Sequence, residues 1–562
     1  MNRPWSRALL GLFTASVLAA QGGGAVFPSD ADIRKILVDR IDARKQGVGI
    51  VVGAIDPSGR RIVSYGTFDG DERKVDGDTL FEIGSVSKVF TALLLADAVA
   101  RGEVSLDDPV AKYLPSEVKV PERGGKKITL VDLATHTSAL PRLPLNLSPK
   151  DPANPYADYG AKQLYEFLSS YELARDIGAR YEYSNLGAGL LAHALARRAG
   201  SDFETLVRSR ITGPLGMKST VAVPGDALRA RLAPGHDASR ARTGSWDFDA
   251  LAGAGAIRST ANDMLAFLAA NLGLAPSPLA PAMSSMLGVR RPTGGPGMDI
   301  ALGWHILKTG DREIVWHNGG TGGYRSFVGF DPKRRAGVVV LSNMFTDVGV
   351  DDIGRHLLDP ASPLSAAPKQ RTEIALDPKV LERYVGRYQL APNFVLTVTR
   401  EGARLFAQAT GQPKLELFAE AEREFFYKVV DAQISFKVGE SGPATGLVLH
   451  QGGRDMPAKR LAGDAPPPKE RKEIALDGAV LDRYVGRYQL APGFFVAITR
   501  EGDQLFLQAT GQGKAPMFAE SETEFFLKVV DAQVTFVREG EGPASKLILH
   551  QNGMDLPAPR TE

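Results

Sequence analysis

A serine and a lysine stand three residues apart where a glycine-bearing turn meets a long apolar run. They are Ser85 and Lys88, within FEIGSVSKVF. On a helix, positions i and i+3 face the same way, so the two side chains can hydrogen bond within one turn. A serine hydroxyl is a weak nucleophile until a neighbouring base takes its proton, and an amine shielded from water can be that base. Because the free N–H groups at a helix N-terminus can also hold an oxyanion, the pair indicates nucleophilic catalysis.

The same spacing has a plain structural interpretation, in which Ser85 caps a helix beside a solvated lysine. A second pair in the chain shows how little the spacing means by itself. Ser116 and Lys119, in LPSEVKVPER, stand between prolines and have no apolar helical period after them. The first pair is followed by KVFTALLLADAVARGE, a helical pattern that can hold both side chains together.

Two further motifs have residue types that suit the same chemistry. Tyr183 and Asn185, in YEYSNLGAGLLAHAL, precede a second long apolar helical pattern. His317 and Gly319, in IVWHNGGTGGYRS, end a strand pattern, and Gly320 follows them. Glycines at a strand end let a substrate backbone approach closely. The alternatives are a core tyrosine, an asparagine helix cap and a hydrogen-bonded core histidine.

The order Ser-x-x-Lys, Tyr-x-Asn, His-x-Gly resembles the serine β-lactamase and penicillin-binding-protein superfamily, particularly its class C β-lactamase, D-aminopeptidase and esterase branch. LATHTSALP at residues 133–141 is similar to the LLTHTSGLP of this family, with Ala139 in place of glycine, and GAGAIRSTANDM at 253–264 also matches it. His136, within the first of these segments, is predicted to be structural. The resemblance covers nearly all of residues 28–358.

The resemblance implies a role for each motif residue. Ser85 would be the acylated nucleophile, Lys88 the proton acceptor, and Tyr183 the group that passes a proton to the leaving group and helps to activate the deacylating water. The substrate-binding groups would be Asn185, which bonds a substrate amide, His317, and the glycines Gly319 and Gly320. The backbone N–H groups of Ser85 and Gly320 would form the oxyanion hole.

Many relatives have Lys-Thr-Gly where this chain has His317, Asn318 and Gly319. Lys308, Thr309 and Gly310 spell that motif, but KTGDRE is turn-like and precedes the strand that ends at the histidine. HNGG is therefore the better match. Imidazole is only fractionally charged near neutral pH, so binding of a substrate carboxylate at this position is less assured.

The elements that must position these residues follow from periodicity. Strand patterns lie near the start of the catalytic unit, VGIVVGAID and RIVSYGTF, and near its end, EIVWHNGG, SFVGFDP and AGVVVLSN. Helical patterns such as AKQLYEFLSSYE and STANDMLAFLAANLG fill the middle. We expect an α+β, β-lactamase/transpeptidase-like domain, in which an antiparallel sheet contains both terminal sets of strands and is flanked by helices and a helical subdomain.

An internal repeat occupies the C-terminal part of the chain. EIALDPKVLERYVGRYQLAPNF, from Glu373, recurs as EIALDGAVLDRYVGRYQLAPGF, from Glu473, without an insertion. Alternating strand patterns in each copy predict a small antiparallel β-barrel, with Tyr384, Tyr388, Tyr484 and Tyr488 in the barrel cores. The predicted units are a signal peptide (1–25), the hydrolase domain (26–358), a linker (359–373), the first barrel (374–460), a linker (461–473) and the second barrel (474–562).

Composition limits the partners. The chain has 562 residues and a formal net charge of +2, which gives no long-range field to attract nucleic acid or an anionic membrane. Residues 1–25 have two arginines, a short apolar run and small residues, typical of a secretory signal peptide, so we expect a periplasmic or extracellular protein without a membrane anchor. There is no cysteine, and the histidines have no metal-ligand spacing. No cofactor or metal is expected.

The sequence predicts an exported serine hydrolase that works through an acyl-enzyme on an amide, either a β-lactam or a short peptide. An esterase with the same residues is one alternative. The other is a penicillin-binding receptor that is acylated without turnover. In the D-aminopeptidase branch one of two appended barrels contributes to the substrate site, and this similarity implies that one barrel here restricts access to small or amino-terminal substrates.

Overall fold

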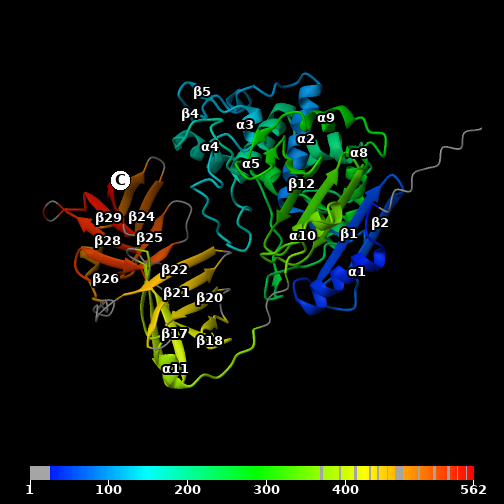
Figure 1. Ribbon diagram of the computed structural model, residues 1–562. Helices are drawn as coiled ribbons and strands as arrows, with labels where there is room; N and C mark the ends of the chain where they lie inside the picture. Colours follow the sequence, from blue (N-terminus) through cyan, green and yellow to red (C-terminus); the bar gives the residue numbers. More distant parts are fainter. Residues whose placement is uncertain are drawn as a thin grey trace, which may run out of the picture.

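The computed structural model (Figure 1) describes the chain in segments. The segment that contains all three motifs is residues 26–366. The others are residues 371–391, 394–410, 414–428, 432–439, 442–451, 454–461, 473–491, 494–509, 514–527, 532–538, 540, 542–551 and 554–561. The predicted signal peptide lies outside the described residues. Among those that are described, no helix is both long and apolar enough to cross a membrane.

The first domain is built on one antiparallel sheet with the strand order β2-β1-β14-β13-β12-β11-β10-β9. The N-terminal strands therefore pair with C-terminal ones, and Val51 of β1 lies opposite Leu341 of β14. This confirms the sheet that the sequence predicts. The strands are β1 (Gly49–Asp56), β2 (Gly59–Gly66), β9 (Arg291–Pro292), β10 (Met298–Ile300), β11 (His305–Thr309), β12 (Arg312–Gly320), β13 (Arg325–Asp331) and β14 (Ala336–Ser342).

Helices cover both faces of this sheet, because alternate residues of its central strands are apolar on both sides. Val51 packs in the same core as Leu265 of α8, whereas Val52 packs in a second core with Ile353 of α10. The helices that contact the sheet are α1 (Asp30–Val38), α8 (Ala261–Asn271) and α10 (Asp351–Leu358).

The remaining helices form the helical subdomain beside the sheet (Figure 1). Helix α2 is buried along most of its length, as its run of apolar residues predicts, and it contacts α5, α6 and α9. The bounds are α2 (Ser87–Ala100), α3 (Leu130–Ala134), α4 (Ala161–Ser170), α5 (Asn185–Ala199), α6 (Phe203–Val207), α7 (Asp226–Arg229) and α9 (Ala280–Met286).

Each repeat forms eight antiparallel strands in sequence order. In the first repeat, β15 (Gly386–Ala391) pairs with β22 (Arg454–Arg460), which closes a barrel. The second repeat has the same order from β23 to β30, and a bridge between Tyr488 and Arg560 joins its two ends. The intervening strands of the first repeat are β16 (Phe394–Glu401), β17 (Arg404–Ala409), β18 (Leu415–Ala419), β19 (Glu424–Phe426), β20 (Ala432–Val438) and β21 (Ala444–Gln451). The eight strands of the second repeat are β23 (Gly486–Ala491), β24 (Phe494–Glu501), β25 (Gln504–Ala509), β26 (Ala515–Ala519), β27 (Glu524–Leu527), β28 (Ala532–Val537), β29 (Lys546–Gln551) and β30 (Met554–Pro559).

The four repeat tyrosines are fully buried, which confirms their predicted place in the barrel cores. Each hydroxyl still has a partner: the Tyr388 hydroxyl donates to the Tyr384 carbonyl oxygen (2.8 Å), and the Tyr488 hydroxyl donates to the Tyr484 carbonyl oxygen (2.9 Å). A short helix precedes each barrel, α11 (Pro378–Glu382) and α12 (Gly478–Leu481).

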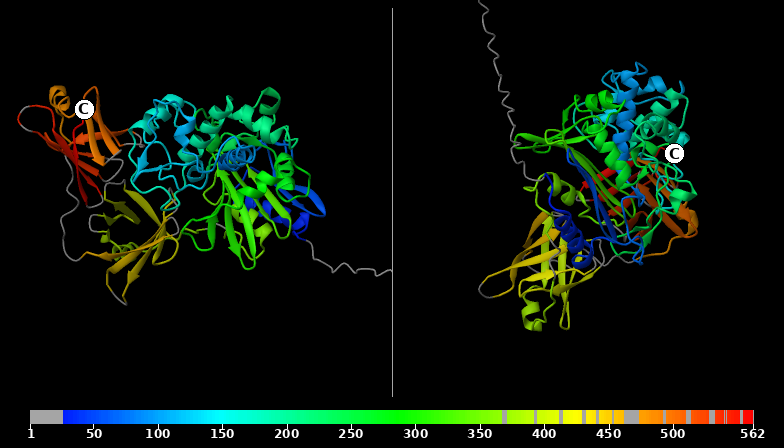
Figure 2. Two further views of the ribbon diagram at one scale, coloured as in Figure 1. Left: turned by 90° about the horizontal axis from the view of Figure 1, so that it is seen from above. Right: turned by 90° about the vertical axis from the view of Figure 1, so that its right-hand side faces the viewer.

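The second barrel lies beside the helical subdomain, as the left view of Figure 2 shows for the orange and cyan segments. A cavity of about 230 Å³ separates Phe495 and Ala497 of β24 from Leu147 and from Tyr171, which follows α4. The first repeat has Val395 and Thr397 at the positions of Phe495 and Ala497, so the two copies differ where the second one faces the hydrolase domain.

Candidate active site

Ser85 lies in a single 3₁₀ turn, Gly84–Val86, directly before α2. The N-cap of α2 is Val86 and has no side-chain cap bond, so the helix-cap interpretation of Ser85 does not hold. The backbone of this turn packs directly on the end of β12, with no room for a side chain between them. A Cβ on Gly84 would lie 2.7 Å from the backbone nitrogen of Gly320, and a Cβ on Gly319 would overlap the carbonyl oxygen of Ile83. Ser85 itself stays partly exposed. The glycines therefore hold the serine against the strand that ends in His-Asn-Gly-Gly.

Lys88 is the buried member of the pair, at 2% exposure. Its Nζ lies 3.0 Å from Ser85 Oγ and donates to the Ala254 carbonyl oxygen at 2.7 Å. Burial lowers the pKa of Lys88 well below its usual value, and the charge of Arg142 lowers it further. A neutral amine has a lone pair that can take a proton, so burial shifts this lysine towards the form that a general base needs.

A loop from the segment GAGAI fixes the lysine from the far side. Thr91 Oγ1 of α2 donates to the Gly253 carbonyl oxygen (2.9 Å), and the Ile257 N–H donates to Ser87 Oγ (3.0 Å). A Cβ on Gly253 would overlap the methyl group of Ala192 in α5. The Ala254 carbonyl is thereby held where it can bond Lys88. Sequence reasoning matched this segment to the family but gave it no role.

Tyr183 lies on the other side of Lys88, with the lysine Nζ 4.8 Å from its ring centroid. Loss of water around the hydroxyl raises the pKa of Tyr183, and a hydrogen bond with Ser85 acts in the opposite direction. Tyr183 therefore keeps its proton at neutral pH and can donate it. The ring of His136 packs 4.6 Å away, and His136 Nδ1 accepts from the Ser184 N–H at 3.2 Å, which gives this histidine a positioning contact.

Asn185 is the first residue of α5, and the helix is capped by Ser184, whose Oγ accepts from the Gly187 N–H at 2.8 Å. The asparagine is thus free of the cap role that the sequence left open. Its Nδ2 donates to the Tyr156 hydroxyl (3.2 Å), while its Oδ1 has no hydrogen-bond partner among the described residues. An acceptor of this kind suits a substrate N–H.

His317 is fully buried, and burial lowers its pKa well below the usual value, with further lowering by His305 and Lys88. Its Nδ1 lies 2.6 Å from the Asn318 carbonyl oxygen, which can only accept, so the proton of the neutral ring is on Nδ1. Nε2 is then an acceptor, and it has no partner in the part of the chain that the structure describes. The ring centroids of His317 and Tyr183 are 6.3 Å apart, so the third motif meets the second.

Two look-alike motifs lie outside this group. Ser116 and Lys119 are both exposed, and only Ser116 lies in a turn. Lys308 and Thr309 end β11 rather than lying in the turn itself, and Lys308 pairs with Glu313 near the start of β12, away from the end that meets Ser85. Neither lysine contacts the serine.

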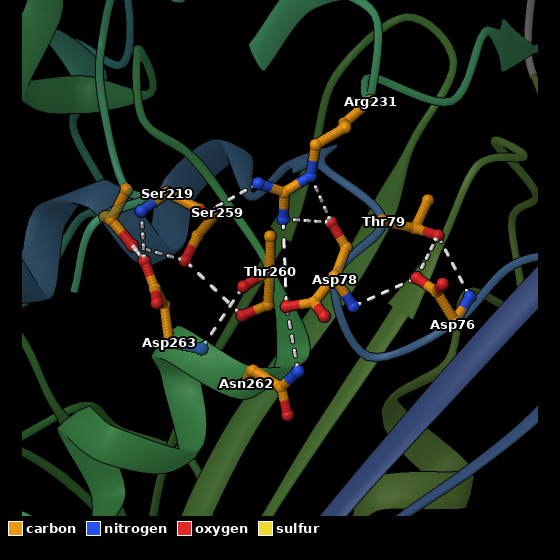
Figure 3. A network of polar contacts seen from close by, with 10 residues as sticks. Asp76, Asp78, Thr79, Ser219, Arg231, Ser259, Thr260, Asn262 and Asp263 are labelled. Carbon is orange, nitrogen blue, oxygen red and sulfur yellow. Dashed lines mark hydrogen bonds and ion pairs between the residues drawn. The ribbon is translucent and has the colours of Figure 1, made fainter. Parts of the chain in front are cut away.

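The segment that leads into Ser85 is anchored by polar contacts. Strand β3 (Phe81–Glu82) pairs with β8 (Arg258–Ser259), and Arg258 Nη2 bonds buried Glu82 Oε1 at 3.1 Å. Just upstream, the carbonyl oxygen of Asp78 accepts from Arg231 Nε (3.1 Å) and its carboxylate accepts from Asn262 Nδ2 (2.9 Å), as Figure 3 shows. These bonds fix the chain on the N-terminal side of the nucleophile.

Arg142 is a residue that sequence reasoning missed. Its carbonyl oxygen accepts from the N–H groups of Asn185 (2.9 Å) and Leu186 (3.2 Å), and its guanidinium carbon lies 5.1 Å from the Tyr183 ring centroid. The only feature of the sequence that could have indicated a role for this residue is its position directly after LATHTSALP. That it lies beside the Tyr-x-Asn motif is known only from the tertiary structure.

The fold and the three converging motifs define a class: a serine hydrolase with a Ser-x-x-Lys nucleophile between an antiparallel sheet and a helical subdomain. Residues 36–361 match the family described as Beta-lactamase, so the chain belongs to the β-lactamase family. Residues 370–460 and 470–558 each match the domain of unknown function DUF3471.

Individual relatives agree with this family. The D-alanyl-D-alanine-carboxypeptidase/endopeptidase AmpH of Escherichia coli K12 is 32% identical over 325 residues, which are 55% of this chain and 83% of that protein. A β-lactamase of Pseudomonas fluorescens is 28% identical over 56% of this chain and 94% of its own. The crystal structure of a β-lactamase/D-alanine carboxypeptidase from Yersinia pestis is 27% identical, with a TM-score of 0.51, over 60% of this chain and 98% of its own. The protein is a serine hydrolase of the class C β-lactamase and penicillin-binding-protein type, and the family acts on small-molecule or peptide substrates.

Proposed function

We propose that the protein is an exported hydrolase that forms an acyl-enzyme on Ser85 with an amide substrate, a β-lactam or a short peptide. One observation carries the proposal. The amine of Lys88 is buried, lacks a carboxylate partner among the described residues, and lies 3.0 Å from Ser85 Oγ. An amine whose charged form is disfavoured by burial, at this distance from a partly exposed hydroxyl, is the arrangement that nucleophilic catalysis needs.

In the proposed reaction Lys88 takes the Ser85 proton as Oγ attacks the amide carbonyl carbon. The backbone N–H groups of Ser85 and Gly320 receive the oxyanion, and such donors commonly provide a large part of the rate enhancement. When the C–N bond breaks, Tyr183 gives its proton to the leaving nitrogen and is reprotonated from Lys88. Water then attacks the ester carbonyl carbon while Lys88 takes one of its protons. The C–Oγ bond breaks, Lys88 returns that proton to Ser85 Oγ, and the carboxylic acid product is released.

Substrate binding in this proposal uses the two unpaired acceptors. Asn185 Oδ1 accepts an N–H of the substrate, and His317 Nε2 accepts a second donor. Neutral His317 does not offer the ammonium group that a lysine would place in the third motif, so a carboxylate gains no charge-assisted bond there.

Intact-protein mass spectrometry over time tests the function and its two competitors. A mixture of nitrocefin, D- and L-amino acid anilides and p-nitrophenyl esters should give a transient adduct on Ser85 with an amide. Ser85→Ala should abolish the adduct, and Tyr183→Phe should prolong it. A persistent adduct in the wild-type protein identifies a penicillin-binding receptor instead, and turnover of esters alone identifies an esterase.

Export and domain division are part of the same proposal. Residues 1–25 would direct secretion to the periplasm or the medium and be removed, and residues 26–358 would form the hydrolase domain, followed by two barrels at 374–460 and 474–562 joined by linkers at 359–373 and 461–473. N-terminal sequencing of the protein recovered from the cell envelope tests the first point. A mature N-terminus at Met1 would contradict it.

A further inference from the structure

Backbone hydrogen bonds hold Arg142 at the proposed substrate site, and its side chain is exposed to solvent. The two hydrogen bonds from the N–H groups of Asn185 and Leu186 to its carbonyl oxygen join it to the start of α5, beside the asparagine that the proposed function assigns to the substrate amide. Its guanidinium packs against the Tyr183 ring, 5.1 Å from the centroid. The cation therefore lies where the acyl part of a substrate would pass.

The guanidinium of Arg142 has no acidic partner among the described residues. Two arginines that precede the same tyrosine in the sequence do have one: Arg175 Nη1 lies 2.7 Å from Glu182 Oε2, and Arg180 Nη2 lies 3.3 Å from the same oxygen. Near Gly320, Arg325 is also a cation, but its Nε donates to the Thr346 carbonyl oxygen (2.8 Å) and the charges of Asp351 and Asp347 act on it. Arg142 is thus an exposed positive charge beside Tyr183 that has no ion-pair partner in the described part of the chain.

The groups around it provide no negative charge. The charge of Arg142 acts on Lys88, His136, Tyr156 and Tyr181, and no carboxylate of the described residues contributes to the pKa shifts of these four groups. Burial lowers the pKa of Lys88 and of His136, so a positive charge is disfavoured on both of these neighbours of the guanidinium. An exposed cation without an acidic partner attracts an anionic ligand group, and an arginine fork fits a carboxylate in particular.

We propose that Arg142 is a specificity residue that binds a carboxylate on the acyl part of the substrate, so that the protein prefers amides with an anionic acyl group. The proposal rests on the proposed function, because it places the acyl chain beside Asn185. It also places carboxylate recognition on the Tyr-x-Asn side of the site, opposite the strand whose third motif has a neutral histidine.

Two matched substrate pairs test this preference. Carbenicillin differs from benzylpenicillin by one carboxylate on the acyl side chain, and succinyl-alanine p-nitroanilide differs in the same way from its acetyl counterpart. For the full-length wild-type protein we expect the anionic member of each pair to acylate Ser85 faster. Arg142→Ala should remove about tenfold in kcat/KM or acylation rate from the anionic member, the effect of one charge-assisted hydrogen bond, and less than about twofold from the neutral member. Arg142→Lys should retain part of the preference.

Arg180→Ala is the matched control, since it removes an arginine that lies three residues before Tyr183 and whose charge is already paired with Glu182. It should leave both rates near wild type. If Arg142→Ala slows both members of a pair equally, or neither, the carboxylate subsite is refuted while the serine hydrolase stands. If the folded wild-type protein forms no adduct and releases no product with either member, the proposed function itself fails. Thermal unfolding of each variant verifies that it is folded.

Discussion

Replacing Lys88 by methionine tests whether the amine is neutral in the folded protein. Burial lowers the pKa of Lys88 well below its ordinary value of 10.5. In the unfolded chain the same lysine binds a proton below about pH 10.4. Protons therefore favour the unfolded state between these two pKa values, and the wild-type protein loses stability as the pH falls through that window. Methionine has a similar length and no proton to bind, so its stability lacks this dependence.

The magnitude follows from one proton. The free energy of unfolding of the wild type should fall by about 1.4 kcal/mol per pH unit, relative to Lys88→Met, as the pH is lowered from 10 towards the folded pKa. The variant also loses the hydrogen bond to the Ala254 carbonyl oxygen, which lies 2.7 Å from Nζ. That loss costs about 1–3 kcal/mol at every pH. It therefore changes the difference in unfolding free energy between the two proteins by a constant amount and does not change how that difference depends on pH.

Denaturant unfolding of the full chain at pH 7, 8, 9 and 10 measures this slope through tryptophan fluorescence. Three of the four tryptophans, Trp246, Trp304 and Trp316, lie in the hydrolase domain. The fourth is Trp5, within the predicted signal peptide, and the barrels have none, so a change of fluorescence on unfolding reports the hydrolase domain. Lys119→Met, at the exposed lysine of the second Ser-x-x-Lys pair, is the control and should show no slope relative to wild type. A constant difference between Lys88→Met and wild type across this range would mean that the folded lysine keeps its proton, and would refute its role as the base.

Two further predictions concern the support of the site. Gly319→Ala should destabilise the hydrolase domain by about 2–3 kcal/mol and lower acylation about a hundredfold, because the new Cβ overlaps the Ile83 carbonyl and shifts the Ser85 turn. Gly244→Ala, at a position with open space, is its control in denaturation and acylation assays, and equal behaviour of the two variants would contradict the packing argument. Deleting residues 462–562 should raise kcat/KM for long peptides relative to short ones, because Phe495 and its neighbours no longer face the loop around Leu147. If the ratio of kcat/KM for long and short peptides does not change, the second barrel has no role in substrate choice. Phe495→Ala tests whether this one side chain is responsible, and Val395→Ala, at the equivalent position of the first repeat, is its control.

Much of the architecture could be predicted because it depends on local periodicity. The helical pattern from residue 161 became α4, and the strand pattern from residue 336 became β14, since each element is specified by which of its own residues are apolar. The repeat predicted two barrels for the same reason. The Ser85 turn was less predictable: the serine precedes the cap of α2, because contacts with β12 shape the turn more than helix capping does.

The sequence by itself determined the residue types and their spacing, which identified Ser85, Lys88, Tyr183 and the histidine motif, because i to i+3 neighbours and strand ends follow from the local backbone. Tertiary structure decided their chemistry. The pKa of Lys88 is lowered because its amine is buried in a core built from distant segments, beside a carbonyl oxygen 166 positions away. Arg142 meets Tyr183 only when two loops pack together. Desolvation and charge depend on all atoms nearby in space, and the chain order of a sequence does not record which atoms those will be.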